Sequence, residues 1–373
     1  MTVWITRFAD LPAGGRIRVA VKDAIDVAGT ITTAGCVAVR ERAVPAVVDA
    51  ACLAGVRAAG AAIVGKTTLT ELCVSPAGDN EAFGAPVNPV APELIPGGSS
   101  SGSAVAVATG EADVGLGTDT GGSVRIPAAC CGVVGLKTTW GRISRAGVTP
   151  LAPTLDTVGP IAPTVDGVVT GMGLLAPGFT PAARQARVVG RLRVDGVDPA
   201  VEEDAALDAA GLTVRPVRLP GWEETYGALD TIILGELWRV HHALLDAGGM
   251  GSFVMTGLRA GRAVTAERMA AALATRERWR AEVAAVLSDV DVLALPTLVG
   301  PPPPLADFRA YQLTRLTAPF NLAGVPAIAL PVPSPGFAVP VSLQLVGPEY
   351  GEELLCATAQ ASTAASRGTP PRP

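Results

Sequence analysis

Short apolar stretches, separated by turns rich in glycine and proline, recur along this chain and constrain its fold more than any other feature. Residues 16–21 alternate as a strand, and residues 61–64 and 113–117 are typical of strands. Residues 49–59 begin with an aspartate N-cap and have a helical pattern, and residues 103–109 form a helix of small residues. Strands that alternate with helices in this way predict an α/β domain.

The remainder of the chain returns to the same pattern after a more variable middle segment. We predict a strand over 188–194 and a helix over 199–210, then strands over 290–295, 327–332 and 340–346. Residues 367–373 are expected to be a frayed tail.

Composition excludes several classes of protein. About half of the residues are apolar (49%) and 17% are charged, which argues against disorder. The net charge of −5 comes without a polybasic face, so we expect no nucleic-acid partner. The first residues lack the features of a signal peptide, and no run reaches the roughly 18 apolar residues of a membrane span. We therefore expect a cytoplasmic protein with no membrane partner, and a homodimer is compatible with the sequence.

Histidine and lysine are both scarce. The two histidines, His241 and His242, are adjacent and point in different directions, which nearly excludes a histidine metal cluster. The lysines are Lys22, Lys66 and Lys137, among 29 lysines and arginines. Because arginine cannot lose its proton in a protein, a lysine kept in such a chain is a candidate base.

One motif suggests nucleotide binding. Residues 60–67 match the phosphate-binding pattern G-x-x-x-x-G-K-[ST]. That pattern requires a loop between a strand and a helix, whereas here the four intervening residues are the predicted strand itself. We therefore treat the match as accidental.

A second motif suggests a hydrolase elbow. Residues 98–102 match G-x-S-x-G, which would make Ser100 a nucleophile with His241 or His242 as its base. An elbow follows directly on a strand, but the prolines of residues 91–96 disfavour one. This esterase-like alternative stays open behind the next one.

The third constellation combines Lys66 with two serine loops. Ser99 lies in a Gly/Ser loop, and Ser123 ends the glycine-rich turn 117–123. A buried lysine can activate a serine because desolvation lowers the pKa of its amine. The glycines before Ser123 allow successive N–H groups to converge on an oxyanion.

At this point the sequence resembles the amidase signature family. The resemblance covers most of the chain, and the order and spacing of its motifs are specific. The matching segments are 21–27, 33–35, 59–61, 65–67, 97–100, 117–125, 132–137, 155–160, 319–324 with Pro326, and 343–347.

The resemblance implies an α/β fold in one large domain, 1–373, whose mixed, twisted central sheet is covered by helices on both faces. It implies a family-like core over 16–166 and 286–362, with a variable substrate-pocket segment over 177–285. The catalytic lysine falls on Lys66, a serine with a cis peptide bond on Ser99, and the nucleophile on Ser123. The amides of Thr120, Gly121, Gly122 and Ser123 resemble the oxyanion hole, and Ser100, Asp119 and Arg125 match supporting positions.

The implied reaction is hydrolysis of a carboxamide C–N bond in a small-molecule substrate. Ser123 attacks the carbonyl, Ser99 relays its proton to Lys66, and water resolves the acyl-enzyme, with no metal or organic cofactor. An ammonia-releasing component of an amidotransferase complex is the alternative within the family.

Several residues carry plainer interpretations. Lys22 and Lys137 are expected to be structural, and Cys73, Cys130 and Cys131 to be small buried hydrophobes. Trp222, Tyr226 and Trp238 are candidates for the lining of an acyl or aryl pocket. Ser101 and Thr138 depart from the glycine and proline that the family usually has there.

Overall fold

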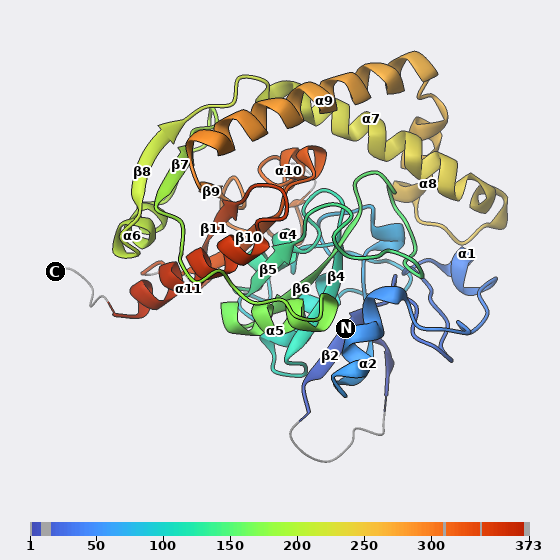
Figure 1. The fold of residues 1–373 in the computed structure, drawn as a ribbon. Coiled ribbons are helices and arrows are strands. Elements are labelled where there is room, and N and C mark those ends of the chain that lie inside the picture. The colour runs from blue at the N-terminus through green and yellow to red at the C-terminus, as the bar shows by residue number, and fades with distance from the viewer. Residues whose placement is uncertain (1, 9–15, 309–310, 336–337, 369–373) are drawn as a thin grey trace.

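The computed structural model describes residues 2–8, 16–308, 311–335 and 338–368, and its strands join in one mixed sheet (Figure 1). The order of the eleven strands in this described part is β1-β3-β2-β4-β6-β5-β10-β11-β9-β7-β8. The predicted α/β fold with a mixed sheet is confirmed. The strands are β1 Trp4–Arg7, β2 Arg18–Lys22, β3 Ala62–Thr67, β4 Val114–Asp119, β5 Val134–Lys137, β6 Thr157–Ala162, β7 Val188–Leu192, β8 Thr213–Val217, β9 Val292–Pro296, β10 Ala327–Val332 and β11 Val341–Val346.

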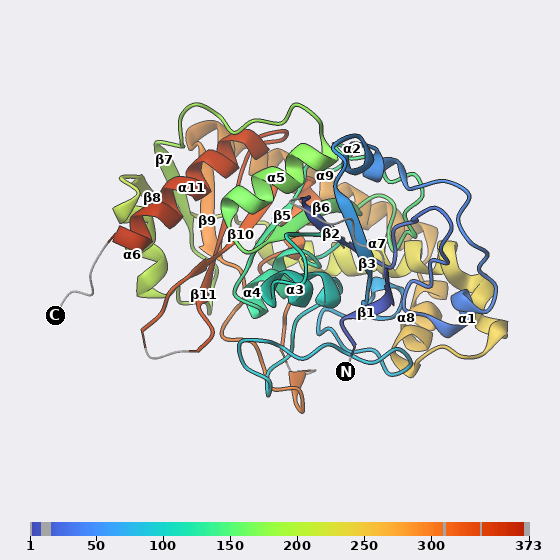
Figure 2. The same ribbon diagram turned by 90° about the horizontal axis from the view of Figure 1, so that it is seen from below.

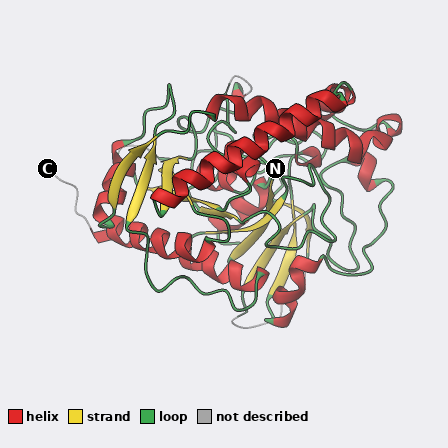
Figure 3. Cartoon of the chain, turned by 45° about the horizontal axis from the view of Figure 1, so that its top comes forward, coloured by secondary structure: helices red, strands yellow, loops and turns green. Residues whose placement is uncertain are grey.

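Helices cover both faces of the sheet. On one face lie α5 (Val165–Leu175) and α11 (Glu352–Gly368), and on the other lie α3 (Ser101–Ala108) and α4 (Arg125–Cys130) (Figure 2). A third group packs across one end of the molecule, as Figure 3 shows for the long helices; it comprises α7 (Trp222–His241), α8 (Ser252–Arg262) and α9 (Ala266–Asp289). The shorter helices are α1 Val37–Arg40, α2 Ala54–Ala58, α6 Val201–Ala209 and α10 Ala318–Ala323, with the 3₁₀ turns η1 Ala51–Leu53, η2 Glu71–Cys73 and η3 His242–Ala247. Within the described ranges, none of the helices is long and apolar enough to cross a membrane.

Three neighbouring parallel strands position the site. Strand β2 lies between β3 and β4 and runs parallel to both, so the carboxyl ends of all three meet at one edge. In the β2–β3 register Val21 pairs with Lys66 and Lys22 pairs with Thr67. Because side chains alternate along a strand, Lys66 and Lys22 point to opposite faces of the sheet.

The predicted helix over 49–59 differs from the structure. The helix over 49–59 is replaced by η1 and the short α2, and the carboxylate of Asp49 caps neither of them. It accepts from the N–H of Ala28 (2.8 Å) and pairs with Arg57, because an arginine within reach competes for a carboxylate at a helix start. Residues 367 and 368 close α11, and residues 369–373 of the predicted tail lie outside the described residues.

Candidate active site

Lys22, at the end of β2, is the lysine in contact with the serine loops. Its Nζ donates to Ser99 Oγ and to Thr118 Oγ1, both at 2.7 Å. The side chain is fully buried. Burial lowers the pKa of the Lys22 amine, and the nearby Cys73, Asp119 and Asp156 partly oppose that shift. A buried amine with a lowered pKa, hydrogen-bonded to a serine, has the features of a general base.

Lys66 is held elsewhere. Its Nζ lies 2.7 Å from Asp23 Oδ1 in an ion pair whose side chains are both fully buried, and it also donates to Thr32 Oγ1 (2.6 Å) and to the carbonyl of Ile31 (3.0 Å). Among the described residues Lys66 makes no hydrogen bond to Ser99. The expected pairing of Lys66 with the serine loop is therefore corrected to Lys22, because the register of β2 and β3 puts Lys66 on the other face of the sheet.

The two serine loops lie side by side. The peptide bond between Gly98 and Ser99 is cis, in agreement with the resemblance. The N–H of Ser100 donates to the carbonyl of Ser123 (3.2 Å), and Ser100 Oγ donates to the carbonyl of Thr118 (3.3 Å). Ser123 is 8% exposed, whereas Ser99 is fully buried. Of the two serines, Ser123 is thus the one that a substrate can reach.

The glycine turn before Ser123 offers fewer free amides than expected. The N–H of Gly122 donates to Asp119 Oδ1 at 2.8 Å, so a carboxylate already occupies this donor. The side chain of Thr120 is held by Asp156 Oδ1 at 2.6 Å. The candidate oxyanion donors are therefore the backbone amides of Thr120, Gly121 and Ser123.

A buried network fixes the turn from behind. Arg125 pairs with Asp119 at 3.0 Å, and both side chains are fully buried. Burial alone would raise the pKa of Asp119, but the guanidinium of Arg125 and further donors hold that pKa well below its usual range. Arg125 also donates to Asn321 Oδ1 and to Gln344 Oε1, each at 2.6 Å. The supporting positions proposed for Asp119 and Arg125 thus coincide with the centre of this network.

Sequence reasoning missed Thr118, Asn321 and Gln344 as parts of the site, and treated Lys22 as structural. A signal for each was present. Each residue lies in a segment that matches the family: Lys22 in 21–27 and Thr118 in 117–125. Asn321 lies in 319–324 and Gln344 in 343–347. No local pattern, however, indicates which of these side chains turn toward Ser123.

The residues of the elbow alternative are not brought together. Ser100 bonds to the backbone of β4, and the Nε2 of His241 lies 2.8 Å from the carbonyl of Pro150. The ring of His242, the first residue of η3, packs against the ring of Trp238, and its Nδ1 lies 3.1 Å from the carbonyl of Trp238. The phosphate-binding match also lacks its loop, because most of its intervening residues belong to β3.

The three aromatic candidates have different surroundings. Trp222 packs edge-to-face against Trp279 and Phe320 in the core. Trp238 contacts His242 and Arg262. Of the three, only Tyr226 is linked to the glycine turn, through Thr314. The hydroxyl of Tyr226 lies 3.3 Å from Thr314 Oγ1, and the methyl group of Thr314 lies 3.8 Å from the position that a Cβ on Gly121 would occupy.

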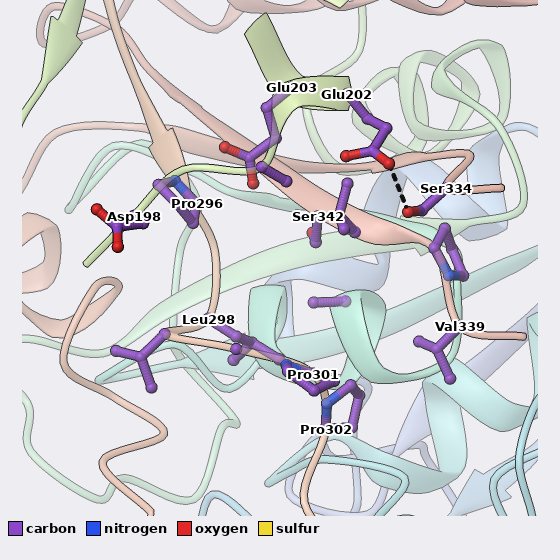
Figure 4. A pocket seen from close by; sticks show the side chains of 16 residues that line it. Asp198, Glu202, Glu203, Pro296, Leu298, Pro301, Pro302, Ser334, Val339 and Ser342 are labelled. Atoms are coloured by element: carbon purple, nitrogen blue, oxygen red, sulfur yellow. Dashed lines mark hydrogen bonds between the residues drawn. The ribbon is translucent and has the colours of Figure 1, made fainter. Parts of the chain in front are cut away.

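Two cavities of the molecule differ in whether residues of the serine loops line them. A cavity of about 10 Å³ beside the serine loops is lined by residues that include Cys73, Thr118 and Thr120. A much larger one, of about 320 Å³, lies between the end of β9 and the start of α6 (Figure 4). Its acidic rim includes Glu202, which accepts from Ser334 at 2.8 Å, and Glu203, whose pKa burial raises to about 7. None of its lining residues belongs to the serine loops, so its size does not make it the reaction site.

Known proteins resemble this chain over nearly its whole length. A family model described as Amidase matches residues 15–356. A glutamyl-tRNA(Gln) amidotransferase subunit from Haloarcula marismortui is 35% identical over 92% of this chain and 93% of its own length. The protein of the same name from Thermus thermophilus is 34% identical, over 92% of this chain and 83% of its own.

Solved structures agree with the sequence matches. A crystal structure of an amidase is 34% identical, with a TM-score of 0.85 over 93% of this chain and 84% of its own. A 6-aminohexanoate cyclic dimer hydrolase bound to its substrate is 26% identical, with a TM-score of 0.84 over 97% of this chain and 89% of its own. The chain belongs to the amidase signature family.

Proposed function

We propose that this protein cleaves a carboxamide C–N bond through an acyl-enzyme on Ser123, with Ser99 as proton relay and Lys22 as base. The observation that carries the proposal is the 2.7 Å hydrogen bond between the buried amine of Lys22 and Ser99 Oγ. The role first given to Lys66 passes to Lys22, because Lys66 is engaged by Asp23.

The proton path follows from this contact. Ser123 Oγ attacks the amide carbonyl while its proton moves to Ser99, and Ser99 passes its own proton to neutral Lys22. Lys22 then returns a proton through Ser99 to the leaving nitrogen, and the C–N bond breaks. Water resolves the acyl-enzyme by the same relay, which releases a carboxylic acid and regenerates Ser123. The chemistry requires no metal or organic cofactor.

The backbone of the glycine turn would stabilise the oxyanion. The amides of Thr120, Gly121 and Ser123 are its candidate donors, while Asp119 holds the N–H of Gly122 and so fixes the conformation of the turn. Loss of one oxyanion donor typically costs about 3 kcal/mol of transition-state stabilisation. We further propose that segment 177–285 shapes the substrate side of the site, since Tyr226 of α7 reaches Thr314 near Gly121.

Labelling with a fluorophosphonate tests the relay without knowledge of the substrate. We expect wild type to carry the adduct on Ser123, and Ser123→Ala to lose it while keeping its fold. Lys22→Met should slow labelling at least about 100-fold, because the base is removed. Lys66→Met should lower the thermal midpoint, because Asp23 is left buried and unpaired, yet the folded protein should still be labelled.

The measurement is mass spectrometry of the labelled peptide against time at a mildly alkaline pH. An adduct on Ser100 would contradict the assignment of the nucleophile. Fast labelling of Lys22→Met together with slow labelling of a folded Lys66→Met would return the role of base to Lys66.

A second candidate function is the release of ammonia within an amidotransferase complex. The names of the two curated relatives described above favour this version over a stand-alone linear amidase, since both are components of glutamyl-tRNA(Gln) amidotransferases. The acyl-enzyme chemistry is the same, and the versions differ in substrate and partners. If the isolated chain hydrolyses aryl and aliphatic amides but not glutamine, the stand-alone version holds. Glutaminase activity that requires a co-purified protein partner would establish the amidotransferase version.

A further inference from the structure

Cys73 lies next to Thr118, a hydrogen-bond partner of the Lys22 amine, which the proposed function makes the base. Its Sγ is 4.0 Å from Thr118 Oγ1, the same hydroxyl that accepts from Lys22 at 2.7 Å. The thiol is among the groups that raise the pKa of the Lys22 amine, and the residue is buried. Cys73 also lines the cavity of about 10 Å³ next to Thr118 and Thr120.

The backbone around Cys73 is built to hold this position. Leu72 and Cys73 both adopt left-handed conformations, with φ of 47° and 62°, which non-glycine residues seldom do. Two backbone hydrogen bonds anchor the turn: the N–H of Leu72 donates to the carbonyl of Ala34 (2.9 Å), and the N–H of Thr70 donates to the carbonyl of Ser99 (3.3 Å). The turn is therefore bonded directly to the loop of the relay serine.

A protonated lysine has three donors, and the structure shows hydrogen-bond partners for two of them. These partners are Ser99 Oγ and Thr118 Oγ1. The sulfur of Cys73, a weak acceptor, lies 4.0 Å from Thr118 Oγ1 and is the group that we assign to the third donor. During acylation Lys22 becomes an ammonium in a site without exposed surface, where an unsatisfied donor is costly.

We infer that Cys73 is a positioning residue for the reaction, whose thiol is the third partner of the Lys22 ammonium that forms when Ser123 is acylated. The inference rests on the proposed function of Lys22. Cys73 does not touch the reacting carbonyl, and it acts through the base.

The expected change in pH dependence has a definite sign. Burial lowers the pKa of Lys22, while Cys73, Asp119 and Asp156, the ionisable groups that face it, raise that pKa. Asp119 is itself paired with Arg125, and Asp156 is held by Thr120. Removal of the thiol takes away one of the groups that raise the pKa of Lys22. The pKa should then fall, and Lys22 should be neutral from a lower pH upward.

The test is the rate of fluorophosphonate labelling of Ser123, measured from acidic to alkaline pH in wild type, Cys73→Ala and Cys73→Ser. In Cys73→Ala we expect the acid limb to move down by about 0.5 pH unit and the plateau rate to fall several-fold. Cys73→Ser keeps an acceptor and should restore most of the plateau. Cys36→Ala, at another buried cysteine of the same core cluster, is the matched control and should leave the profile in place.

A wild-type profile for a folded Cys73→Ala would overturn the inference. The inference would also be overturned if the plateau rate of labelling fell equally in Cys73→Ala and Cys36→Ala and Cys73→Ser did not restore it. That result would indicate an effect of core packing alone. Failure of the proposed function is recognised separately, because in that case Lys22→Met would label at the wild-type rate.

Discussion

At the scale of single residues, the site depends on how buried charges are assigned to partners. Asp23 forms an ion pair with Lys66, and Asp119 forms one with Arg125. The side chains of both pairs have no exposed surface. Lys22 has hydroxyl partners and no carboxylate within ion-pair distance among the described residues. Burial without a paired carboxylate lowers the pKa of Lys22, so its amine can be neutral.

Replacement of Asp119 by asparagine should destabilise the protein strongly. The change leaves the Arg125 guanidinium buried without its counter-ion, so we expect the free energy of unfolding to fall by roughly 3–5 kcal/mol. Urea denaturation measures the difference. Asp113→Asn, which breaks the half-exposed pair with Arg18, is the matched control and should cost about 1 kcal/mol or less.

The pH dependence gives a second check on Asp119. Because its pKa is depressed in the folded protein, its contribution to stability is present above the unfolded pKa of about 3.9 and is lost only as the pH falls through the lower folded value. The stability difference between wild type and Asp119→Asn should therefore be constant from about pH 5 to 8. A difference that already shrinks within that range would contradict a carboxylate held ionised by Arg125.

At the scale of elements, the C-terminal helix is tied to the loop that follows β5. Glu352, in the first turn of α11, accepts from the N–H of Thr139 (2.7 Å) and from Arg142 Nη1 (2.6 Å), and its side chain is fully buried. Arg142 also pairs with Glu353. Helix α11 in turn packs against β10, whose neighbour β11 carries Gln344 to the network behind Ser123.

Arg142→Ala should loosen this helix more than it changes the rest of the fold. The change removes one hydrogen-bond donor from the buried carboxylate of Glu352, so we expect the free energy of local unfolding of α11 to fall by about 2 kcal/mol. Amides of α11 should then exchange with solvent about 10-fold or more faster, while those of β4 change less. Arg278→Ala removes an exposed pair with Glu224 and should leave α11 protected. Unchanged exchange in Arg142→Ala would show that apolar packing alone holds the helix.

At the scale of the whole molecule, the site joins parts of the chain that are far apart in sequence. Arg125 bonds to Asn321 and Gln344, 196 and 219 positions away, and Lys22 bonds to Ser99 across 77. The mixed sheet makes this possible, because β2 and β4 are parallel neighbours while β10 and β11 return antiparallel alongside β5. The nucleophile loop is thus enclosed by elements from both ends of the chain.

The sequence alone determined the class of fold and most of the reacting groups. The strand patterns at β2, β3, β4 and β9 to β11 are short-range features, and so is the glycine-rich turn that ends in Ser123. Ser99, Ser123, Asp119 and Arg125 could be singled out because each lies in a motif of fixed spacing. These features depend on neighbours in the chain, which a sequence displays directly.

Only the tertiary structure decided which lysine faces Ser99. Lys22 and Lys66 both lie at the ends of apolar strands, both are buried, and both lie in segments that match the family. The choice follows from the register of β2 against β3, which sends Lys22 and Lys66 to opposite faces, and from Asp23, which captures Lys66. The tertiary structure also decided the position of Cys73, whose place beside Thr118 depends on a left-handed turn bonded to the Ser99 loop. Strand register and long-range hydrogen bonds arise between segments distant in sequence, so no local pattern could have made the choice.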